Sequence, residues 1–236
     1  MRLIKLLITN PFLFAYKAYR RVIWYYRLYI LKDIYPVETT RWFKDKGDET
    51  LMFEYPELNE DSLVFDVGGY HGDFAKKIND KYGCKVYIFE PHPEFYKICL
   101  DRFEQNEKVI PLNYGLSDKG GVFTISDSLD SSSFVHPNHK NKVGIKCQVK
   151  EIFKTIDELK ISHIDLMKIN IEGSEYPLLL NMADKNKLSL VSQYQIQFHN
   201  FIDGASLMRD QIIDALSKNH QRSWCYTFVW ENWKKK

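Results

Sequence analysis

Short apolar runs alternate with amphipathic stretches through most of the chain. Six of these runs are typical of buried strands, and they lie at residues 62–66, 85–90, 109–113, 164–169, 188–198 and 224–230. The stretches between them favour helices, at residues 75–82, 94–106, 176–185 and 206–217. This alternation predicts an α/β fold, with a mainly parallel sheet covered by helices on both faces. A hairpin is expected to open at Gly120-Gly121 and to continue into a strand at residues 122–125.

Acidic side chains close the first two strands, Asp66 after the first and Glu90 after the second. Ligands of such sheets bind beyond the carboxyl ends of the strands, so both carboxylates are candidates for a binding site. Gly68 and Gly72 follow Asp66 and let the backbone approach a ligand closely. The dinucleotide fingerprint GxGxxG would need two further glycines that are missing here, and the sequence contains no GxxxxGK[ST]. A nicotinamide cofactor and a P-loop nucleotide are therefore disfavoured.

The two carboxylates suggest a ligand with an amine and a ribose. Asp66 suits an ammonium group, and Glu90 is placed to accept both hydroxyls of a ribose. Together they fit S-adenosylmethionine, a nucleoside that carries no phosphate. Ser117 and Asp118 follow the third strand, where Asp118 could accept a hydrogen bond from the exocyclic amine of adenine. An acidic residue in an ordinary turn explains this pair equally well.

Five blocks of sequence carry a family resemblance. DVGGYHG, VYIFEPHP, LNYGLSD, IDLMKINIEGSE and IQFHN occur in this order and resemble the FkbM-type S-adenosylmethionine-dependent methyltransferases, from about Trp42 to the C-terminus. The resemblance implies a class I methyltransferase fold with a seven-stranded Rossmann-like sheet, whose seventh strand is assumed near the C-terminus. It also implies O-methylation of a sugar or polyketide hydroxyl. The residues expected to line the cofactor are Asp66, Gly68, Gly69, Tyr70, Gly72, Glu90, Ser117, Asp118 and Asn170.

The chain departs from the family pattern at three positions. Tyr70 stands where the family usually has Asn, Asn170 where it has Asp, and Gln197 where it has Glu. Magnesium needs charged oxygen ligands, and Asn170 and Gln197 are neutral. No metal is therefore expected at the site. Asn170 is expected to form a hydrogen bond with the methionine moiety of the cofactor.

A hydroxyl acceptor must lose its proton during methyl transfer, so a general base is expected. His199 is the first candidate, because a neutral imidazole suits this role at pH 7, although a surface or capping histidine is an equal alternative. Glu172 is the second candidate, either as the base or as a residue that holds the substrate. Glu175 is expected to charge the first turn of the following helix, which Ser174 at the cap also favours. Lys168 is expected to be a paired structural lysine.

A serine-rich stretch at residues 127–140 has no periodicity and is a candidate lid over the acceptor. It contains His136 and His139, but no acidic or cysteine partner nearby completes a zinc site. Several aromatic residues could stack on a sugar ring, although core packing explains each of them as well, and these are Trp42, Phe43, Phe134, Phe198 and Phe201.

The composition is that of a soluble globular chain, with 236 residues, 44% hydrophobic and 27% charged. Its four cysteines contain no CxxC pair, which is typical of reduced thiols and predicts a cytoplasmic protein. The net charge is +2, yet residues 1–32 contain seven basic residues and no acidic one, so the remainder carries −5. Because the body lacks a basic track, nucleic acid is not an expected partner.

The basic segment predicts a helical arm, assigned to residues 1–45, in front of a methyltransferase domain at residues 46–236. Its longest run without charge has eleven residues and is broken by Asn10-Pro11, so neither a membrane span nor a signal peptide is expected. Within residues 1–32, the basic residues from Lys17 onward fall within about 140° of a helix, beside aromatic and aliphatic positions. This pattern fits peripheral contact with the inner face of a membrane, or packing on the body or on a second subunit.

The sequence therefore predicts a methyltransferase that acts on a hydroxyl of a sugar, polysaccharide or glycolipid. Two alternatives stay open. One is a catalytically weak scaffold that binds the cofactor, which the neutral Asn170 and Gln197 favour. The other is an O-methyltransferase of a small molecule that is not a sugar.

Overall fold

The computed structural model describes residues 10–125 and 144–236. Its strands are β1 (Leu63–Val67), β2 (Lys85–Phe89), β3 (Val109–Leu112), β4 (Gly115–Ser117), β5 (Gly121–Ile125), β6 (Ile145–Glu151), β7 (Ile164–Ile169), β8 (Val191–Ile196), β9 (His220–Tyr226) and β10 (Trp230–Lys235). The helices that pack around them are α3 (Ile34–Lys44), α4 (Gly47–Thr50), α5 (Asp73–Tyr82), α6 (Pro93–Arg102), α7 (Ile152–Glu158), α8 (Glu175–Asp184), η2 (Leu188–Leu190) and α9 (Ala205–Leu216). Two further helices, α2 (Pro11–Tyr25) and η1 (Tyr26–Ile30), precede α3.

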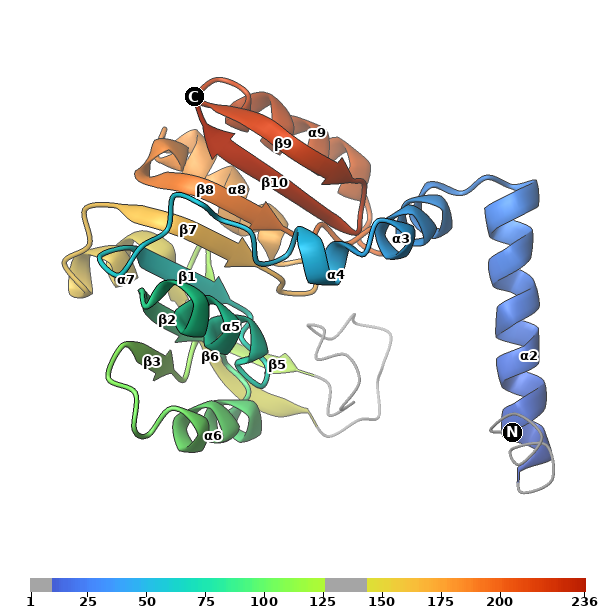
Figure 1. Cartoon of the computed structure of the whole chain (residues 1–236), viewed down its shortest axis with the longest axis horizontal. Helices are drawn as coiled ribbons and strands as arrows, with labels where there is room; N and C mark the ends of the chain where they lie inside the picture. Colours follow the sequence, from blue (N-terminus) through green and yellow to red (C-terminus); the bar gives the residue numbers. More distant parts are fainter. Residues whose placement is uncertain (1–9, 126–143) are drawn as a thin grey trace.

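Seven strands form the central sheet, in the order β3-β2-β1-β7-β8-β10-β9 (Figure 1). The pairs from β3 to β8 are parallel, and β10 runs antiparallel to both of its neighbours. This is the expected Rossmann-like sheet. Because β2 and β7 lie on opposite sides of β1, the loops after β1 and β7 diverge there, which is where ligands of such sheets bind.

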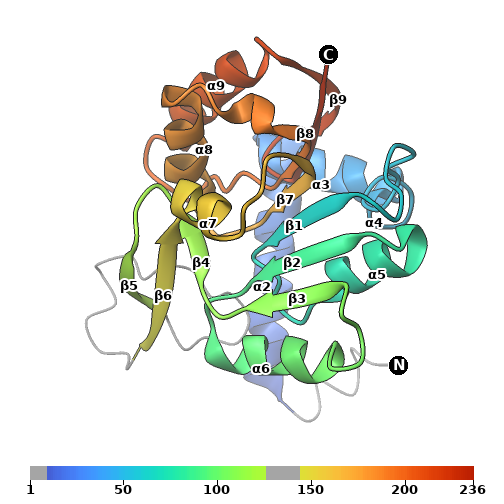
Figure 2. The same cartoon turned by 90° about the vertical axis from the view of Figure 1, so that its left-hand side faces the viewer.

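Helices cover both faces of the sheet, as expected (Figures 1 and 2). On one face α5 and α6 pack against alternate residues of the strands, such as Val64 and Ile88. On the other face α7, α8 and α9 pack against the residues between them, such as Phe65 and Phe89. The central strands β1, β2 and β7 are thus buried on both sides, which explains their continuous apolar runs in the sequence.

The C-terminal strands differ from the sequence expectation. The single strand predicted at 224–230 is wrong, because that segment contains the end of β9, a turn, and the first residue of β10. Phe228 occupies the turn with a φ of 61°, a left-handed backbone conformation without the glycine that normally marks it. The run at 188–198 is also shorter than expected, since a 3₁₀ turn precedes β8 and residues 197 and 198 follow it.

A second, smaller sheet has the order β4-β6-β5. The strand expected after Gly120-Gly121 is β5, and it pairs antiparallel with β6, as expected for a hairpin. On its other side β6 pairs in parallel with β4. The stretch proposed as a lid, with His136, His139 and Phe134, lies outside the described residues.

The predicted arm consists of two parts with different surroundings. α3 belongs to the body, since its Trp42 is 2% exposed and packs against Trp224 and Tyr226. α2 and η1, called the arm from here on, stand away from the body and contain no buried residue (Figure 1). Its described contact with the body is small and includes the edge-on packing of Trp24 against Tyr35 of α3, so the three alternatives for the arm stay open. Among the described residues, no helix is both long and apolar enough to cross a membrane.

Truncation of Trp42 tests the attachment of α3. We expect Trp42→Ala to lower the free energy of unfolding by about 3–5 kcal/mol, because it removes a buried ring that contacts two aromatic neighbours. The matched control is Phe43→Ala, whose side chain is 65% exposed and whose loss should cost no more than about 0.5 kcal/mol. Urea denaturation measures both. An equal loss in the two variants would show that α3 is not held by the Trp42 ring.

Candidate functional site

A buried ion pair joins the two central strands at their carboxyl ends. Lys168 Nζ on β7 lies 2.8 Å from Asp66 Oδ1 on β1 and donates to the carbonyl oxygen of Gly68 at 2.6 Å. This confirms the structural pairing expected for Lys168. Burial raises the pKa of Asp66, and the ammonium group of Lys168 opposes that shift. Lys168 occupies only one oxygen of Asp66, and the other, Oδ2, is buried without a hydrogen-bond partner among the described residues, so it can still accept a hydrogen bond from a ligand ammonium.

The loop after β1 brings backbone close to the ligand edge of the sheet. Gly68 has a φ of 84°, and a Cβ at this position would lie 1.9 Å from the carbonyl oxygen of Asn170. A Cβ on Gly69 would lie 2.1 Å from the side chain of Ile88. Tyr70 also has a left-handed backbone, with a φ of 51°, where the family usually has Asn, a residue that tolerates this conformation better. Close packing thus leaves no room for a side chain at Gly68 or Gly69, and it restricts the conformation of the loop after β1.

Glu90 is anchored by backbone amides on both of its oxygens. Oε2 accepts a hydrogen bond from the Tyr70 amide at 2.7 Å, and Oε1 accepts one from the His92 amide at 2.9 Å. Burial raises the pKa of Glu90 to about 7, although these two amides favour the ionised form. The carboxylate therefore keeps a fixed orientation, with lone pairs left for two hydroxyl donors.

The loop after β7 carries strained backbone and an unpaired acceptor. Glu172 has a φ of 52° and Gly173 one of 102°. Such a conformation in a residue with a side chain costs about 1–3 kcal/mol and is common at functional sites. Asn170, at the start of the loop, has a buried side-chain oxygen without a hydrogen-bond partner among the described residues. That oxygen can accept a hydrogen bond from a ligand ammonium, as expected for Asn170.

His199 lies between two carboxylates, Glu172 in the loop after β7 and Glu175 at the start of α8. Its Nδ1 is 2.9 Å from Glu175 Oε1, and its Nε2 is 3.6 Å from Glu172 Oε1. Burial alone would lower the pKa of His199, but the two carboxylates outweigh it and raise the pKa to about 9. The neutral imidazole expected at pH 7 is therefore wrong, because the ring carries a positive charge in this setting.

Glu175 lies in the first turn of α8, as expected, and it also positions His199. Its side chain is fully buried and accepts hydrogen bonds from the Gly173 amide and the His199 amide, at 2.8 and 2.9 Å. Ser174 makes no side-chain capping bond. The hydroxyl of Tyr176 donates to the His199 carbonyl at 2.7 Å. The first two residues of α8 therefore bind both the backbone N–H and the backbone carbonyl of His199.

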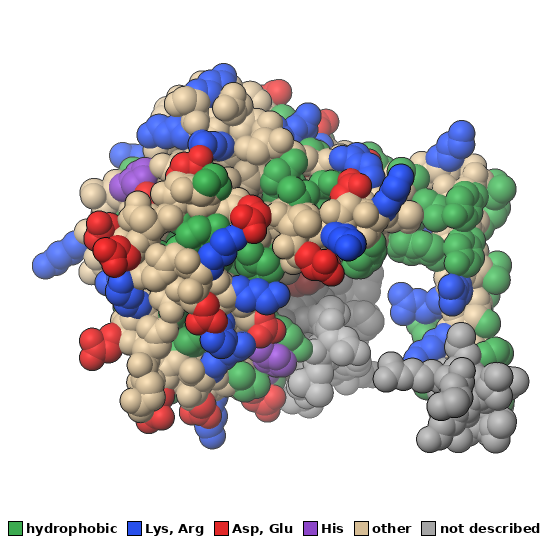
Figure 3. Space-filling model, in the orientation of Figure 1, with side chains coloured by type: hydrophobic (Ala, Val, Ile, Leu, Met, Phe, Trp, Pro, Cys, Tyr) green, Lys and Arg blue, Asp and Glu red, His purple; other side chains and the backbone are tan. Residues whose placement is uncertain are grey.

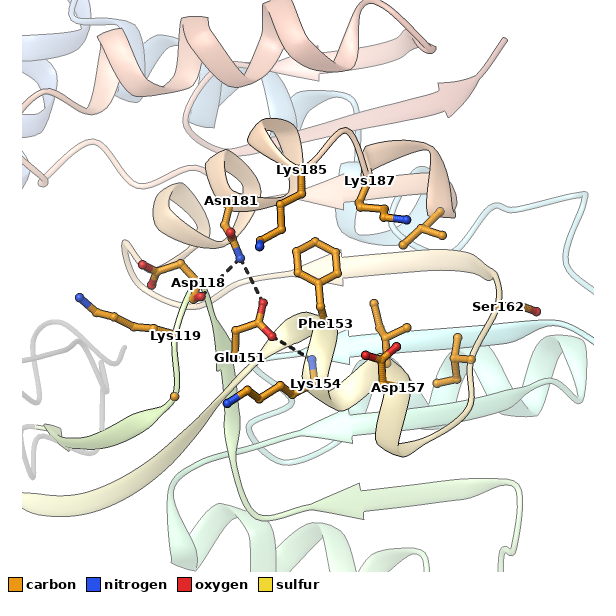
Figure 4. A pocket seen from close by; sticks show the side chains of 14 residues that line it. Asp118, Lys119, Glu151, Phe153, Lys154, Asp157, Ser162, Asn181, Lys185 and Lys187 are labelled. Carbon is orange, nitrogen blue, oxygen red and sulfur yellow. Dashed lines mark hydrogen bonds between the residues drawn. The ribbon is translucent and has the colours of Figure 1, made fainter.

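Ser117 and Asp118 lie apart from this group. Asp118 lines a surface pocket with Glu151 and Asn181, shown in Figure 4, and that pocket also contains residues that directly precede β7 and β8. It therefore belongs to the opposite edge of the sheet, away from the carboxyl ends. The placement gives no support to the predicted contact with adenine.

Asn113, the first residue after β3, was not among the predicted site residues. Its side-chain amide donates to the carbonyl oxygens of Glu90 and Pro91, at 3.2 and 3.4 Å, which places it at the carboxyl edge. The signal was its position directly after the third strand, since residues there border a ligand at the sheet edge.

One of the candidate aromatic residues remains available beside His199. Trp42 and Phe198 are buried in the core, so they cannot stack on a ligand. Phe201 is 48% exposed, and its ring centre is 5.3 Å from that of His199. Phe43 is exposed too, but it lies on α3.

A profile of the methyltransferase FkbM domain matches residues 66–222, which is more than half of the chain and includes every group described above except Trp42 and Phe43. The chain belongs to the FkbM methyltransferase family. The resemblance read from the five sequence blocks is confirmed, and so are the class I methyltransferase fold and the dependence on S-adenosylmethionine.

Individual relatives are more distant. The hexuronic acid methyltransferase AglP of Haloferax volcanii is 28% identical over 158 residues, which cover 62% of this chain and 60% of that protein. The antimetabolite synthetase AmbE of Pseudomonas aeruginosa is 26% identical over 103 residues, 44% of this chain and 5% of that protein. A solved fibrillarin/Nop5p complex superimposes with a TM-score of 0.50 at 10% identity, covering 83% of this chain and 82% of that one, and shows the fold alone. The matched part of this chain thus spans less than two thirds of the length of AglP and of AmbE.

The residues of this FkbM family member fit its cofactor. Glu90 offers a fixed carboxylate for the ribose, Asn170 offers a buried free oxygen for the ammonium, and Gly68 leaves no side chain in the way. Within residues 10–125 and 144–236, no three His, Cys, Asp or Glu side chains gather as metal ligands.

The assignment of Glu90 predicts a pH dependence of cofactor binding. We expect S-adenosylhomocysteine to bind more tightly as the pH rises from 6 to 8, because Glu90, with a pKa of about 7, then becomes the acceptor that both ribose hydroxyls need. Glu90→Gln should weaken binding at pH 8 by about 10- to 100-fold and should flatten the pH profile. Calorimetric titration measures this, with the exposed Glu104→Gln as control. The ribose assignment fails if Glu90→Gln keeps the pH dependence of the unmodified protein.

Proposed function

We propose that this protein transfers the methyl group of S-adenosylmethionine to a hydroxyl of a sugar, in a polysaccharide or a glycolipid. The observation that carries the proposal is the meeting of a carboxylate, an imidazolium and an exposed aromatic ring, from Glu172, His199 and Phe201. This group follows β7 and β8, and Asn170, whose oxygen is assigned to the cofactor ammonium, begins the same loop as Glu172.

The first part of the proposal concerns the proton. When bound, S-adenosylmethionine would supply an electrophilic methyl group with a neutral thioether as the leaving group. The acceptor hydroxyl gives its proton to Glu172. His199 is already protonated by the influence of two carboxylates, so it serves to hold Glu172 and not to remove the proton. Positioning contributes the rest of the rate, since the sulfonium is a good leaving group.

The second part concerns the sugar. Phe201 offers an exposed apolar face beside the proposed base, and an aromatic ring can cover the C–H face of a sugar while its hydroxyls reach polar side chains. The relation to a hexuronic acid methyltransferase supports the same class of acceptor. A small molecule that is not a sugar remains the alternative acceptor.

Methyl transfer from labelled S-adenosylmethionine to a panel of sugars, uronic acids, glycolipids and phenolic or polyketide alcohols tests the acceptor class. We expect turnover with carbohydrates alone, and Phe201→Ala should raise the KM for the sugar at least several-fold while the affinity for S-adenosylhomocysteine stays unchanged. Turnover only with alcohols that are not sugars would overturn the sugar assignment. Tight cofactor binding without any turnover would support the scaffold alternative instead.

Substitution of Glu172 tests the proposed base. Glu172→Gln should lower kcat by about 100- to 10,000-fold and leave cofactor affinity unchanged, because the amide cannot accept the proton. Above pH 9 we expect the activity of the unmodified protein to fall, as His199 loses the proton that its pKa of about 9 retains at neutral pH. His199→Gln should remove this alkaline limb. Full turnover of Glu172→Gln at a saturating acceptor concentration would assign the base to another group.

A further inference from the structure

The arm combines exposed aromatic residues with positive charge. No residue of α2 is buried, and Phe12 is 88% exposed. Figure 3 shows apolar and basic side chains together on this helix, which is separated from the rest of the molecule. An isolated helix of about 15 residues is only marginally stable in water, so a surface that covers it would stabilise it.

Most of the exposed apolar side chains share one side of the helix, while Leu13 and Tyr25 lie on the other side, near the basic residues. At 100° per residue, Phe12, Tyr19 and Val22 fall within about 80° of one another, and Tyr16 and Tyr26 extend the same face. All of them are largely exposed. Tyrosine and phenylalanine favour the boundary between lipid headgroups and acyl chains, where one end of the side chain is apolar and the other meets water.

The basic side chains lie on the other side, and most lack an acidic partner. In the described part of the arm, Arg27 forms an ion pair with Asp33, while Lys17, Arg20 and Arg21 form none. Arg20 and Arg21 lie over the rings of Tyr16 and Tyr25. With no acidic residue in the first 32 positions, this segment attracts an anionic surface and repels a second copy of itself.

We propose that the arm binds the surface of an anionic lipid bilayer, with its apolar face among the headgroups and its basic residues at the phosphates. The arm then lies in the plane of the interface and does not cross the membrane. Figure 1 shows that β1 and β7 point toward the side on which α2 stands, so the carboxyl edge with the cofactor site faces the same side as the arm.

Vesicle sedimentation of the full chain tests this proposal. We expect binding to vesicles of phosphatidylcholine with phosphatidylglycerol, little binding to phosphatidylcholine alone, and weaker binding as salt is raised. Changing Lys17, Arg20 and Arg21 together to Gln should weaken binding on the order of 100-fold. The matched control changes the exposed body residues Lys97, Lys187 and Lys218 to Gln, with the same loss of charge, and should bind like the unmodified chain.

A second variant tests the apolar face. Changing Phe12, Tyr19 and Val22 together to Ser should also weaken vesicle binding, while calorimetric affinity for S-adenosylhomocysteine stays unchanged and shows that the body is folded. Equal vesicle binding by the arm variants and the body control would overturn the proposal. A dimer seen by light scattering without vesicles, and lost in the serine variant, would overturn it in favour of a second copy as the partner.

Discussion

The site depends on one buried contact, the ion pair of Lys168 with Asp66. These residues come from β7 and β1, the two strands between which the chain reverses its direction of travel across the sheet. Taking two charges out of water is costly, and the geometry compensates, since Lys168 also binds the Gly68 carbonyl. The pair therefore fixes both the spacing of the strands and the loop that follows β1. With that loop held, the Tyr70 amide is placed to orient Glu90, so one contact organises the ribose side of the site.

A second set of contacts organises the acceptor side, and here the imidazole of His199 lies between the carboxylates of Glu172 and Glu175. Glu175 is buried at the start of α8 and holds both the backbone and the ring of His199, which brings β8 into register with the loop after β7. The ring is charged because two carboxylates face it, and its charge in turn keeps Glu172 in place on a strained backbone. The proposed division of labour follows from electrostatics alone. In the proposed mechanism the protonated His199 does not remove the acceptor proton, and Glu172 takes that role.

These contacts show which parts of the fold and the site could be predicted from the sequence. Asp66 and Glu90 were predicted because each directly follows an apolar run, and strand ends are a local property. The charge of His199 was not predictable, because Glu172 and Glu175 are more than twenty positions away and the three meet only after β7 and β8 pair. Asp118 misled because the strand that it ends, β4, belongs to the small sheet and carries the chain away from the carboxyl edge. The turn at Phe228 was not predicted because no glycine or proline marks it in the sequence.

The arm obeys a different constraint from the body. In the body, apolar residues are explained by two cores and by the aromatic cluster around Trp42. In the arm most side chains of the same kinds are exposed, and the contact of Trp24 with Tyr35 of α3 covers only a small part of them. A helix that buries so little gains little tertiary stabilisation, so its wide apolar face supports the proposal of a surface that covers it. The basic residues narrow the choice of that surface, because they repel a second arm and attract phosphate headgroups. If the acceptor is a glycolipid, the same surface that covers the arm also presents the substrate to the carboxyl edge, and binding would then concentrate the enzyme where its acceptor lies.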